Sequence, residues 1–261
     1  NPDRAQHFQN LGEITANVSH ELNNLLSGVA TYPEVLMMDQ HLTPKIRGGL
    51  EMIQDAGKNA SAVVRDLLTI AQCSEAKKES LNLNQIFERY LASREYQQVQ
   101  KDHFRVVPEI FLDPELLPVA GSYFHIEKIM ATLLSHAMKV VAGRENAGVW
   151  VKTANLLINA KNLTTAGGIS PGRYVLFSVW DTGPKIDEDI LSQVFDPYFV
   201  RSGQEKKSSS GLGLAVVWHL VQDHGGVVNL VSDKDQTRFE ILFPAQPDGN
   251  AGSEKNMPTE T

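Results

Sequence analysis

The chain has 261 residues, 42% of them hydrophobic, which is enough for one large domain or two modest ones. Because 24 Lys and Arg residues face 31 Asp and Glu residues, the net charge of -7 disfavours nucleic acid as a partner. A single cysteine, Cys73, excludes an internal disulfide framework and favours a cytoplasmic location. No run approaches the roughly 20 apolar residues that cross a bilayer, so we expect no direct membrane insertion.

Apolar residues recur at spacings of three and four from Phe8 to Val29, which predicts one face of a long first helix. Pro33 is expected to bend or end this helix, and Pro44 suits the first turn of the next one. The polar residues 1–7 lead straight into the pattern. We therefore expect the upstream part of a longer protein to precede this chain.

A second long helix shows a coiled-coil seam of seven-residue period. Its apolar or small positions are Ile46, Leu50, Ile53, Gly57, Ala60, Val64, Leu67 and Ala71. Two such helices cannot bury their stripes alone, so we expect an antiparallel hairpin that pairs with a second copy as a dimeric four-helix bundle. Packing of the hairpin against the rest of the same chain is the alternative.

Near Leu81 the pattern changes to short β-rich runs separated by helices, which predicts a second domain built as an α/β sandwich with a mixed sheet. The predicted strands are 104–107, 149–158, 174–180, 227–231 and 238–243, and the predicted helices are 85–98, 123–141, 188–194 and 212–223. The whole chain is thus expected to be α+β. Its parts are a helical hairpin (1–76), the sandwich domain (77–245) and a flexible tail (246–261).

A polar cluster interrupts the first helix. His20 lies two residues from both Val18 and Leu22, so at about 100° per residue its ring turns away from the apolar stripe. Glu21 is adjacent, and a carboxylate can orient an imidazole or accept its proton, while Asn24, one turn on, can position a water. Spacing alone leaves open whether His20 is a phosphoryl acceptor or part of a surface ion pair.

Two glycine-containing segments indicate an anion site. Asp181 follows a predicted strand and can accept a hydrogen bond from an exocyclic amine such as that of adenine. Gly211 and Gly213 open a predicted helix, where backbone N–H groups can approach a phosphate. Glycines in such pairs also serve as plain turns. The polar segment 195–210 between them is expected to be either a mobile lid or a solvated loop.

The motifs SHELNN, DTGPKI, FDPYF and GLGLAVV, in this order after a long helical start, resemble the transmitter core of two-component sensor histidine kinases. The resemblance extends from about residue 11 to 243. It implies a dimerisation and histidine-phosphotransfer hairpin followed by a Bergerat-type ATP-binding domain. His20 then resembles the phosphoacceptor, Glu21 its activating acid or base, and Asn24 the position that aids hydrolysis of the phosphorylated partner.

The same resemblance implies ATP as the cofactor and assigns the nucleotide-binding residues. Asp181 matches the adenine-binding aspartate, Gly183 the first glycine of its turn, Gly211 and Gly213 the phosphate-side glycines, and Phe195 the phenylalanine box. The implied partners are a response-regulator receiver domain, a second copy of the chain, and a sensor domain upstream.

The sequence departs from the family pattern at three positions. Thr132 and His136 stand where the family has two asparagines, the second of which holds Mg²⁺, and an imidazole is a poor ligand for this hard ion. Lys185 replaces the second glycine of the aspartate turn; it strains a turn that needs positive φ, or lends a positive charge beside the nucleotide. Metal binding at His136 is therefore doubtful.

The expected activity is that of a protein histidine kinase, which autophosphorylates His20 from ATP and passes the phosphoryl group to a receiver aspartate. The alternative is a degenerate kinase with weak or no use of ATP, acting as a histidine phosphotransfer module or a pseudokinase scaffold. The three departures favour the alternative, whereas the ordered set of motifs favours the kinase.

Overall fold

The computed structural model describes residues 25–39, 41–71, 76–103, 105–159, 169–197, 199 and 211–246. The chain packs as two compact units, Asn1–Ala76 with Asp187–Asp223, and Lys77–Ile186 with His224–Thr261. A helical region is followed by a mixed sheet, which confirms the predicted α+β class. None of the described helices is long and apolar enough to cross a membrane.

The first unit begins with a helical hairpin made of a helix at 25–36 and α2 (Pro44–Ala71). The two helices approach closely at Gly57, where an added Cβ would lie only 3.0 Å from the Ala30 nitrogen. The first helix continues through Pro33, whose C=O accepts from the Met37 N–H (2.9 Å). Pro33 was expected to bend or end the helix, and it does not end it, because proline removes one donor while its carbonyl still accepts.

The same unit contains α6 (Gly213–Asp223), which agrees with the predicted helix to within one residue. The helix predicted at 188–194 is wrong. Its hydrogen bonds join Ile190 N–H to Asp187 C=O (3.1 Å) and Gln193 N–H to Ile190 C=O (2.9 Å), three residues back each time. Residues 188–195 therefore form successive turns, which do not build the four-residue ladder of an α-helix.

The second unit is organised around a five-stranded sheet of order β2-β4-β5-β7-β6, in which only β2 and β4 are parallel. The strands are β2 (Glu109–Phe111), β4 (Val149–Ile158), β5 (Gly172–Asp181), β6 (Val227–Ser232) and β7 (Thr237–Pro244). Four of these confirm predicted strands. Two short strands that the sequence analysis missed, β1 (Glu79–Leu81) and β3 (Val119–Gly121), pair separately.

The strand predicted at 104–107 is wrong in position, since β2 begins at Glu109, two residues beyond the end of the predicted range. Pro108 lies between the two ranges and has no N–H, so regular pairing with β4 starts beyond it. In β2 the residues Glu109 to Phe111 face Trp150 to Lys152 of β4 in parallel register. This strand forms one edge of the sheet.

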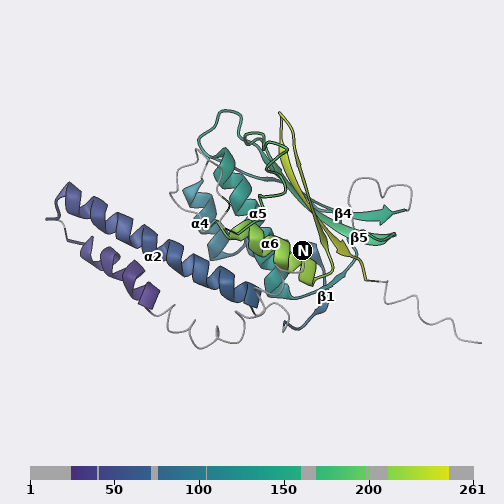
Figure 1. Ribbon diagram of the computed structural model, residues 1–261, viewed down its shortest axis with the longest axis horizontal. Coiled ribbons are helices and arrows are strands. Elements are labelled where there is room, and N and C mark those ends of the chain that lie inside the picture. The colour runs from purple at the N-terminus through teal and green to yellow at the C-terminus, as the bar shows by residue number, and fades with distance from the viewer. Residues whose placement is uncertain are drawn as a thin grey trace, which may run out of the picture. The chain divides into compact units, whose positions relative to one another are not determined.

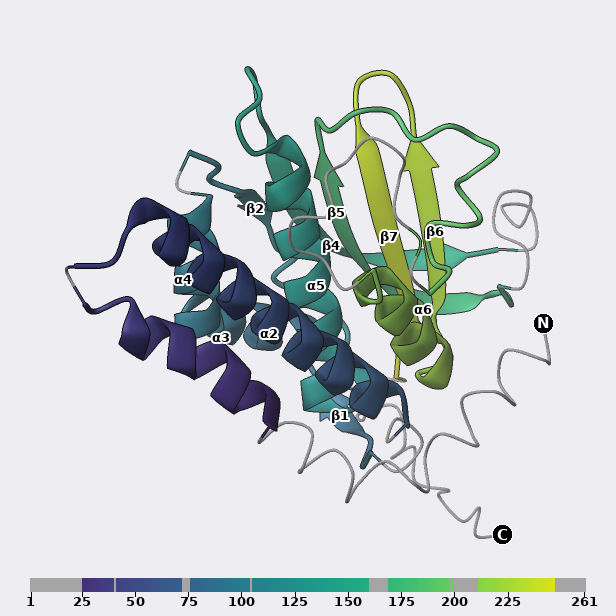
Figure 2. The same ribbon diagram turned by 60° about the vertical axis from the view of Figure 1, so that its left-hand side comes forward.

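Three helices of the second unit lie on one side of the sheet, as two views show (Figures 1 and 2). They are α3 (Leu83–Leu91), α4 (Arg94–Asp102) and α5 (Tyr123–Val141). The single helix predicted at 85–98 is in fact two, because Ser93 caps a new helix by accepting from the Tyr96 N–H (3.1 Å). The predicted helix at 123–141 is confirmed.

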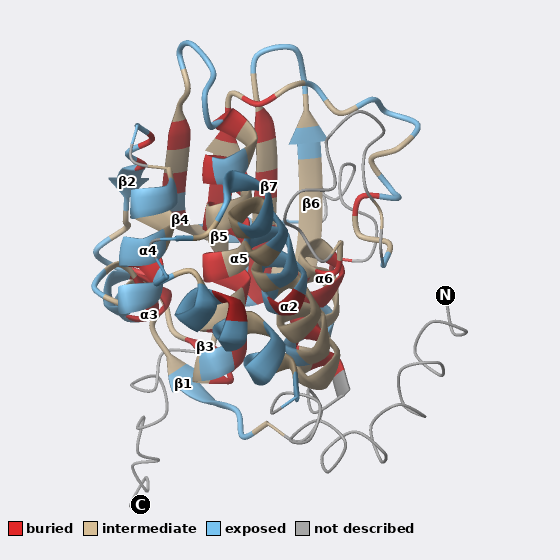
Figure 3. Ribbon diagram, turned by 90° about the vertical axis from the view of Figure 1, so that its left-hand side faces the viewer, coloured by how far each residue is buried: buried red, intermediate tan, exposed pale blue. Residues whose placement is uncertain are grey.

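The core of this unit lies between α5 and the central strands, where Figure 3 shows the buried residues in red along α5, β5 and β7. Ten of the 19 residues of α5 are buried, because apolar side chains occupy the face that contacts β4 and β5. Fully buried members of this core are Phe87, Ile126, Leu133, Leu134, Phe177 and Phe239. The packing fixes where α5 stands relative to the ends of these strands.

Candidate functional site

The candidate site in the second unit is built around Asp181, the last residue of β5, which lies opposite Val149 of β4. Asp181 is 1% exposed, and its Oδ1 accepts a hydrogen bond from the Gly183 N–H (2.7 Å). A Cβ at Gly183 would overlap both this oxygen and the Val140 side chain of α5. Only glycine therefore lets the loop close here, and the second carboxylate oxygen, Oδ2, can accept from a ligand.

Burial raises the pKa of Asp181 to about 6, while the Gly183 N–H and the positive charge of Arg144 work in the opposite direction. The carboxylate is therefore largely ionised at neutral pH in a poorly solvated place. A hydrogen bond to a charged acceptor in such surroundings is stronger than in water. The position suits a ligand that presents an N–H donor, such as the exocyclic amine of adenine, and the site fits this part of ATP.

A second wall of this site comes from α5, where Thr132, His136 and Val140 are spaced by four residues and share one face. Val140 is the residue that approaches the loop at Gly183. The ring of His136 meets Phe239 of β7 edge-on, with centroids 5.7 Å apart and planes at 86°. Burial lowers the pKa of His136 to about 4, and the charge of Lys139 adds to this effect.

The residues at this face do not fit Mg²⁺. The ion prefers hard oxygen ligands in octahedral geometry, whereas His136 offers a neutral nitrogen on a ring packed against an aromatic side chain. Glu127, which lies on the same helix, accepts a hydrogen bond from the Tyr123 hydroxyl (2.8 Å).

Lys185 is exposed and follows Pro184 in the loop that leaves β5. Among the described residues other than glycine, Asn146 alone has a positive φ, so Lys185 does not occupy the left-handed region. The turn thus needs no glycine at this position, and the strain considered from the sequence does not arise. The side chain is available to carry positive charge near the candidate site.

The other predicted nucleotide residues belong to the first unit. Gly211 has a φ of 66°, which glycine adopts readily, and Gly213 is the first residue of α6. Phe195 lies half-buried in the turns that precede them. The remaining predicted site residues, His20, Glu21 and Asn24, lie outside the described part of the chain.

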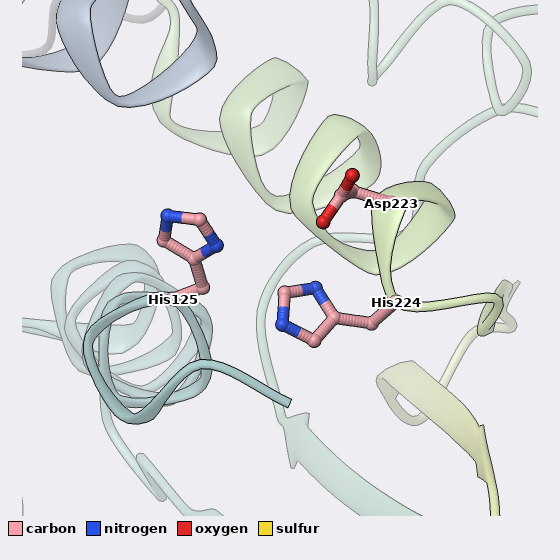
Figure 4. A group of neighbouring side chains, drawn as sticks. All are labelled: His125, Asp223 and His224. Atoms are coloured by element: carbon pink, nitrogen blue, oxygen red, sulfur yellow. The ribbon is translucent and has the colours of Figure 1, made fainter. Parts of the chain in front are cut away.

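A pair of buried histidines was not found from the sequence, because nothing in their spacing marks them. The rings of His125 on α5 and His224 are 5.5 Å apart at 77°, and Figure 4 shows them with Asp223, the residue before His224. These side chains are of metal-ligand types. However, His224 Nε2 accepts from the Ser122 N–H (3.0 Å), which places the proton of the neutral ring on Nδ1 and makes that nitrogen a donor.

The hydrogen bond from Ser122 gives His224 a structural role. Ser122 is the N-cap residue of α5 and makes no side-chain capping bond. A Cβ at Gly121 would contact both His224 and Ile126, so the backbone before α5 passes directly against the imidazole. His224 therefore holds the beginning of the helix that carries Thr132 and His136.

Two family profiles match the chain. The His Kinase A (phospho-acceptor) domain matches residues 10–76, and the histidine kinase-, DNA gyrase B- and HSP90-like ATPase matches residues 121–247. The first match contains the SHELNN motif, and the second contains the Asp181 loop and the Gly211 segment. An ATPase domain of this kind implies ATP binding.

Similar proteins carry both parts. The sensor kinase CckA of Brucella abortus is 24% identical over 92% of this chain, and the sensory histidine kinase/phosphatase NtrB of Rhizobium leguminosarum is 25% identical over 91%. The chain spans 25% and 59% of these two proteins. Full-length ShkA in complex with AMPPNP shares the fold, with a TM-score of 0.64, 21% identity, and coverage of 90% of this chain and 46% of ShkA.

Proposed function

We propose that this chain, a transmitter core of the two-component histidine kinase family, transfers the γ-phosphoryl group of ATP to His20 and from there to an aspartate of a response-regulator receiver domain. The observation that carries the proposal is the buried Asp181 carboxylate, held on one oxygen by Gly183. The presence of a phospho-acceptor domain in the same chain supports it. No comparison favours the scaffold alternative.

The nucleotide supplies the phosphoryl group, and the chain's own residues bind and orient it. Asp181 accepts the hydrogen bond of the adenine amine, and Gly183 keeps the carboxylate in place. Gly211 and Gly213 let backbone N–H groups approach phosphate, as at other helix N-termini. Phe195 contributes an apolar contact, and Lys185 contributes positive charge, the kind of charge that phosphoryl transfer requires. AMPPNP in the ShkA complex supports a nucleotide at this fold.

The acceptor side of the proposed reaction is assigned to His20 and its sequence neighbours. Glu21 accepts the proton from one ring nitrogen of His20 while the other nitrogen attacks the γ-phosphorus of ATP, and this raises the nucleophilicity of the ring. The bond between the γ-phosphorus and its bridging oxygen breaks in the same step, so ADP leaves. Asn24, four residues after His20 in the sequence, is proposed to position a water for a second task, hydrolysis of the phosphorylated receiver. The name kinase/phosphatase of the NtrB relative supports both roles.

The hairpin of residues 1–76 is proposed to dimerise and present His20, while residues 77–245 bind the nucleotide and 246–261 form a tail. The exposure of Ile46 (52%), Met52 (75%) and Ile53 (49%) on α2 supports a second copy as the partner of this helix. Because response regulators and ATP are found there, we place this core in the cytoplasm, downstream of a sensor domain.

The test is phosphorylation from γ-labelled ATP, in the presence of Mg²⁺ or Mn²⁺, followed by acid and alkali treatment. We expect label that is lost in acid and kept in alkali, as a phosphohistidine requires, and no label in His20→Gln. Label that persists in the variant would contradict the assignment of His20. Folded wild-type protein without label, but labelled by a phosphorylated receiver, would instead favour the phosphotransfer alternative.

A further inference from the structure

The junction between β4 and β5 beside Asp181 has an unusual hydrogen-bond arrangement. Thr182 follows Asp181 and lies opposite Gly148, one position beyond the last pair of the strand register, Val149 with Asp181. The Thr182 N–H donates to the Gly148 C=O (3.1 Å). The Gly148 N–H donates in return to the hydroxyl oxygen of Thr182 (3.0 Å), and that hydroxyl donates to the Asn146 C=O (3.2 Å).

In an ordinary antiparallel ladder two opposite residues exchange both backbone hydrogen bonds. Here the Gly148 N–H donates to the hydroxyl oxygen of Thr182, where in a regular ladder it would donate to the Thr182 carbonyl oxygen. The backbone of Thr182 is thereby free to turn away from the sheet while the strand pair remains closed at its end. The chain uses this freedom at once, because the Gly183 N–H turns back to Asp181 Oδ1 (2.7 Å).

The partner side of this junction is restricted in conformation. Asn146 adopts a φ of 59°, which is uncommon for a residue other than glycine. A Cβ at Gly148 would overlap the ring of Trp150, which stacks on Trp180 with centroids 6.0 Å apart and planes at 12°. The Thr182 hydroxyl therefore bonds to a segment whose position is fixed by packing.

We propose that Thr182 is a positioning residue for nucleotide binding: its hydroxyl sets where the strand ends and so directs the Asp181 carboxylate toward the ligand. Thr182 acts through Asp181 and Gly183 and needs no contact with the nucleotide. This inference rests on the proposed function, because it assumes that Asp181 accepts the adenine amine. It adds a specific role for a residue whose type alone gives no such signal.

The experiment measures ATP affinity of the full chain by titration calorimetry for Thr182→Val, which keeps the shape of the side chain and removes the hydroxyl. We expect the affinity for ATP to fall by about tenfold. The variant loses both the bond from the Gly148 N–H to the hydroxyl and the bond from the hydroxyl to the Asn146 C=O, so the Asp181 carboxylate is less well directed. Thr182→Ser retains the hydroxyl and is expected to bind within about twofold of the wild type. Thr182→Ala is a second deletion with no added apolar contact.

Thr153→Val is a matched control in the same sheet. The Thr153 hydroxyl also accepts from a backbone N–H, that of Asp113 (3.0 Å), and donates once, to Asn84 Oδ1 (2.8 Å). Thr153 lies four residues along β4 from Val149, the residue paired with Asp181, and four residues of strand span roughly 13 Å. We expect this variant to lower the melting temperature and leave the ATP affinity unchanged.

A pH titration of ATP affinity separates positioning from a general loss of stability. If Thr182 holds the loop, its removal weakens the Gly183 bond to the ionised carboxylate, and the acid limb of the affinity profile moves to higher pH in Thr182→Val and Thr182→Ala only. Equal affinity and an unmoved profile in both variants would overturn the inference while leaving the proposed function intact. A folded wild type that binds no ATP would overturn both.

Discussion

Helices α2 and α5 show how the same kind of apolar periodicity has different outcomes in two parts of one chain. In α5 ten residues are buried by the sheet and its neighbouring helices. In α2, among the residues whose side chains are described, Gly57, Asp66 and Ile70 alone are buried, although the helix is 28 residues long. The sheet unit therefore satisfies its amphipathic helix within the chain, whereas the hairpin does not.

The two helices obtain their stability from different contacts. A helix gains most of its stability from packing of its apolar face, so α5 is fixed by its own chain. The seam residues Ile46 and Ile53 of α2 remain about half exposed, at 52% and 49%. A second copy that covers this seam would complete the hairpin as a four-helix bundle.

The strongest test of this comparison places the same charge on both helices. Leu134→Asp in α5 puts an unpaired carboxylate at a position with 0% exposure, and we expect the sheet unit not to fold. Ile53→Asp in α2 should leave the fold intact and convert the dimer into monomers. Circular dichroism and light scattering measure the two outcomes.

For both Ile53→Asp and Leu134→Asp, a specific result would contradict the comparison of the two helices. A dimer that persists in Ile53→Asp would show that the exposed seam is not the contact between copies. Ile53→Ser serves as a control for a change of polarity without charge and should weaken the dimer less. A folded Leu134→Asp protein would show that packing on α5 does not determine the stability of the sheet unit.

The sequence predicted the elements with the longest regular patterns. Strands β4, β5, β6 and β7 and helix α5 were expected within two residues of where they lie, because each combines a clear period with burial on one side. The turns at 188–195 were mistaken for a helix, since apolar residues three or four positions apart occur both in a short helix and in successive turns. The break between α3 and α4 was missed because one capping serine, Ser93, decides it.

For the site, residue types were predictable but contacts were not. DTGPKI marked Asp181 and Gly183 as a pair, yet the overlap of a Gly183 Cβ with Val140 depends on how α5 packs. The two hydroxyl bonds of Thr182 join residues 34 and 36 positions apart, and the bond from Ser122 to His224 joins residues 102 positions apart. Such long-range contacts follow from tertiary packing, so no local pattern contains them. The roles of His20, Glu21 and Asn24 stay predictions.

A second prediction concerns Asp181 in the sheet unit, where replacement by Asn changes the ligand contact and is expected to leave the fold intact. In Asp181→Asn the amide oxygen can still accept from Gly183, but the other atom becomes an NH₂ donor that faces the donor of adenine. We expect ATP affinity to fall about 100-fold, measured by calorimetry. Unchanged affinity would contradict the assignment of Asp181.

The same variant makes a prediction for stability that has a definite sign. The folded-state pKa of Asp181 is raised from 3.8 to about 6, so folding favours the protonated form, and this contribution is lost as pH rises between those values. Asn does not titrate. Relative to its stability near pH 3, Asp181→Asn should therefore gain about 3 kcal/mol over the wild type by pH 8, measured by denaturant unfolding without nucleotide.

The smallest effect is expected for His136, which lies on α5. His136→Asn replaces a neutral imidazole with an amide oxygen, a ligand that Mg²⁺ accepts, and we expect the Mg²⁺-dependent part of ATP affinity to rise by about tenfold. Thr132→Asn, one turn earlier, is the control for adding an amide elsewhere on this face. A rise with Mn²⁺ but not Mg²⁺ would contradict this account of the ion preference.

The acid stability of the same variant sharpens the comparison between the helices, because it reports on burial at α5 alone. The pKa of His136 is lowered to about 4, so the unfolded chain takes up a proton near pH 6.5 while the folded chain does not. Stability is therefore lost as pH falls from about 6.5 to 4 in the wild type. His136→Asn should lose less stability over this interval, and denaturant unfolding at a series of pH values measures the difference.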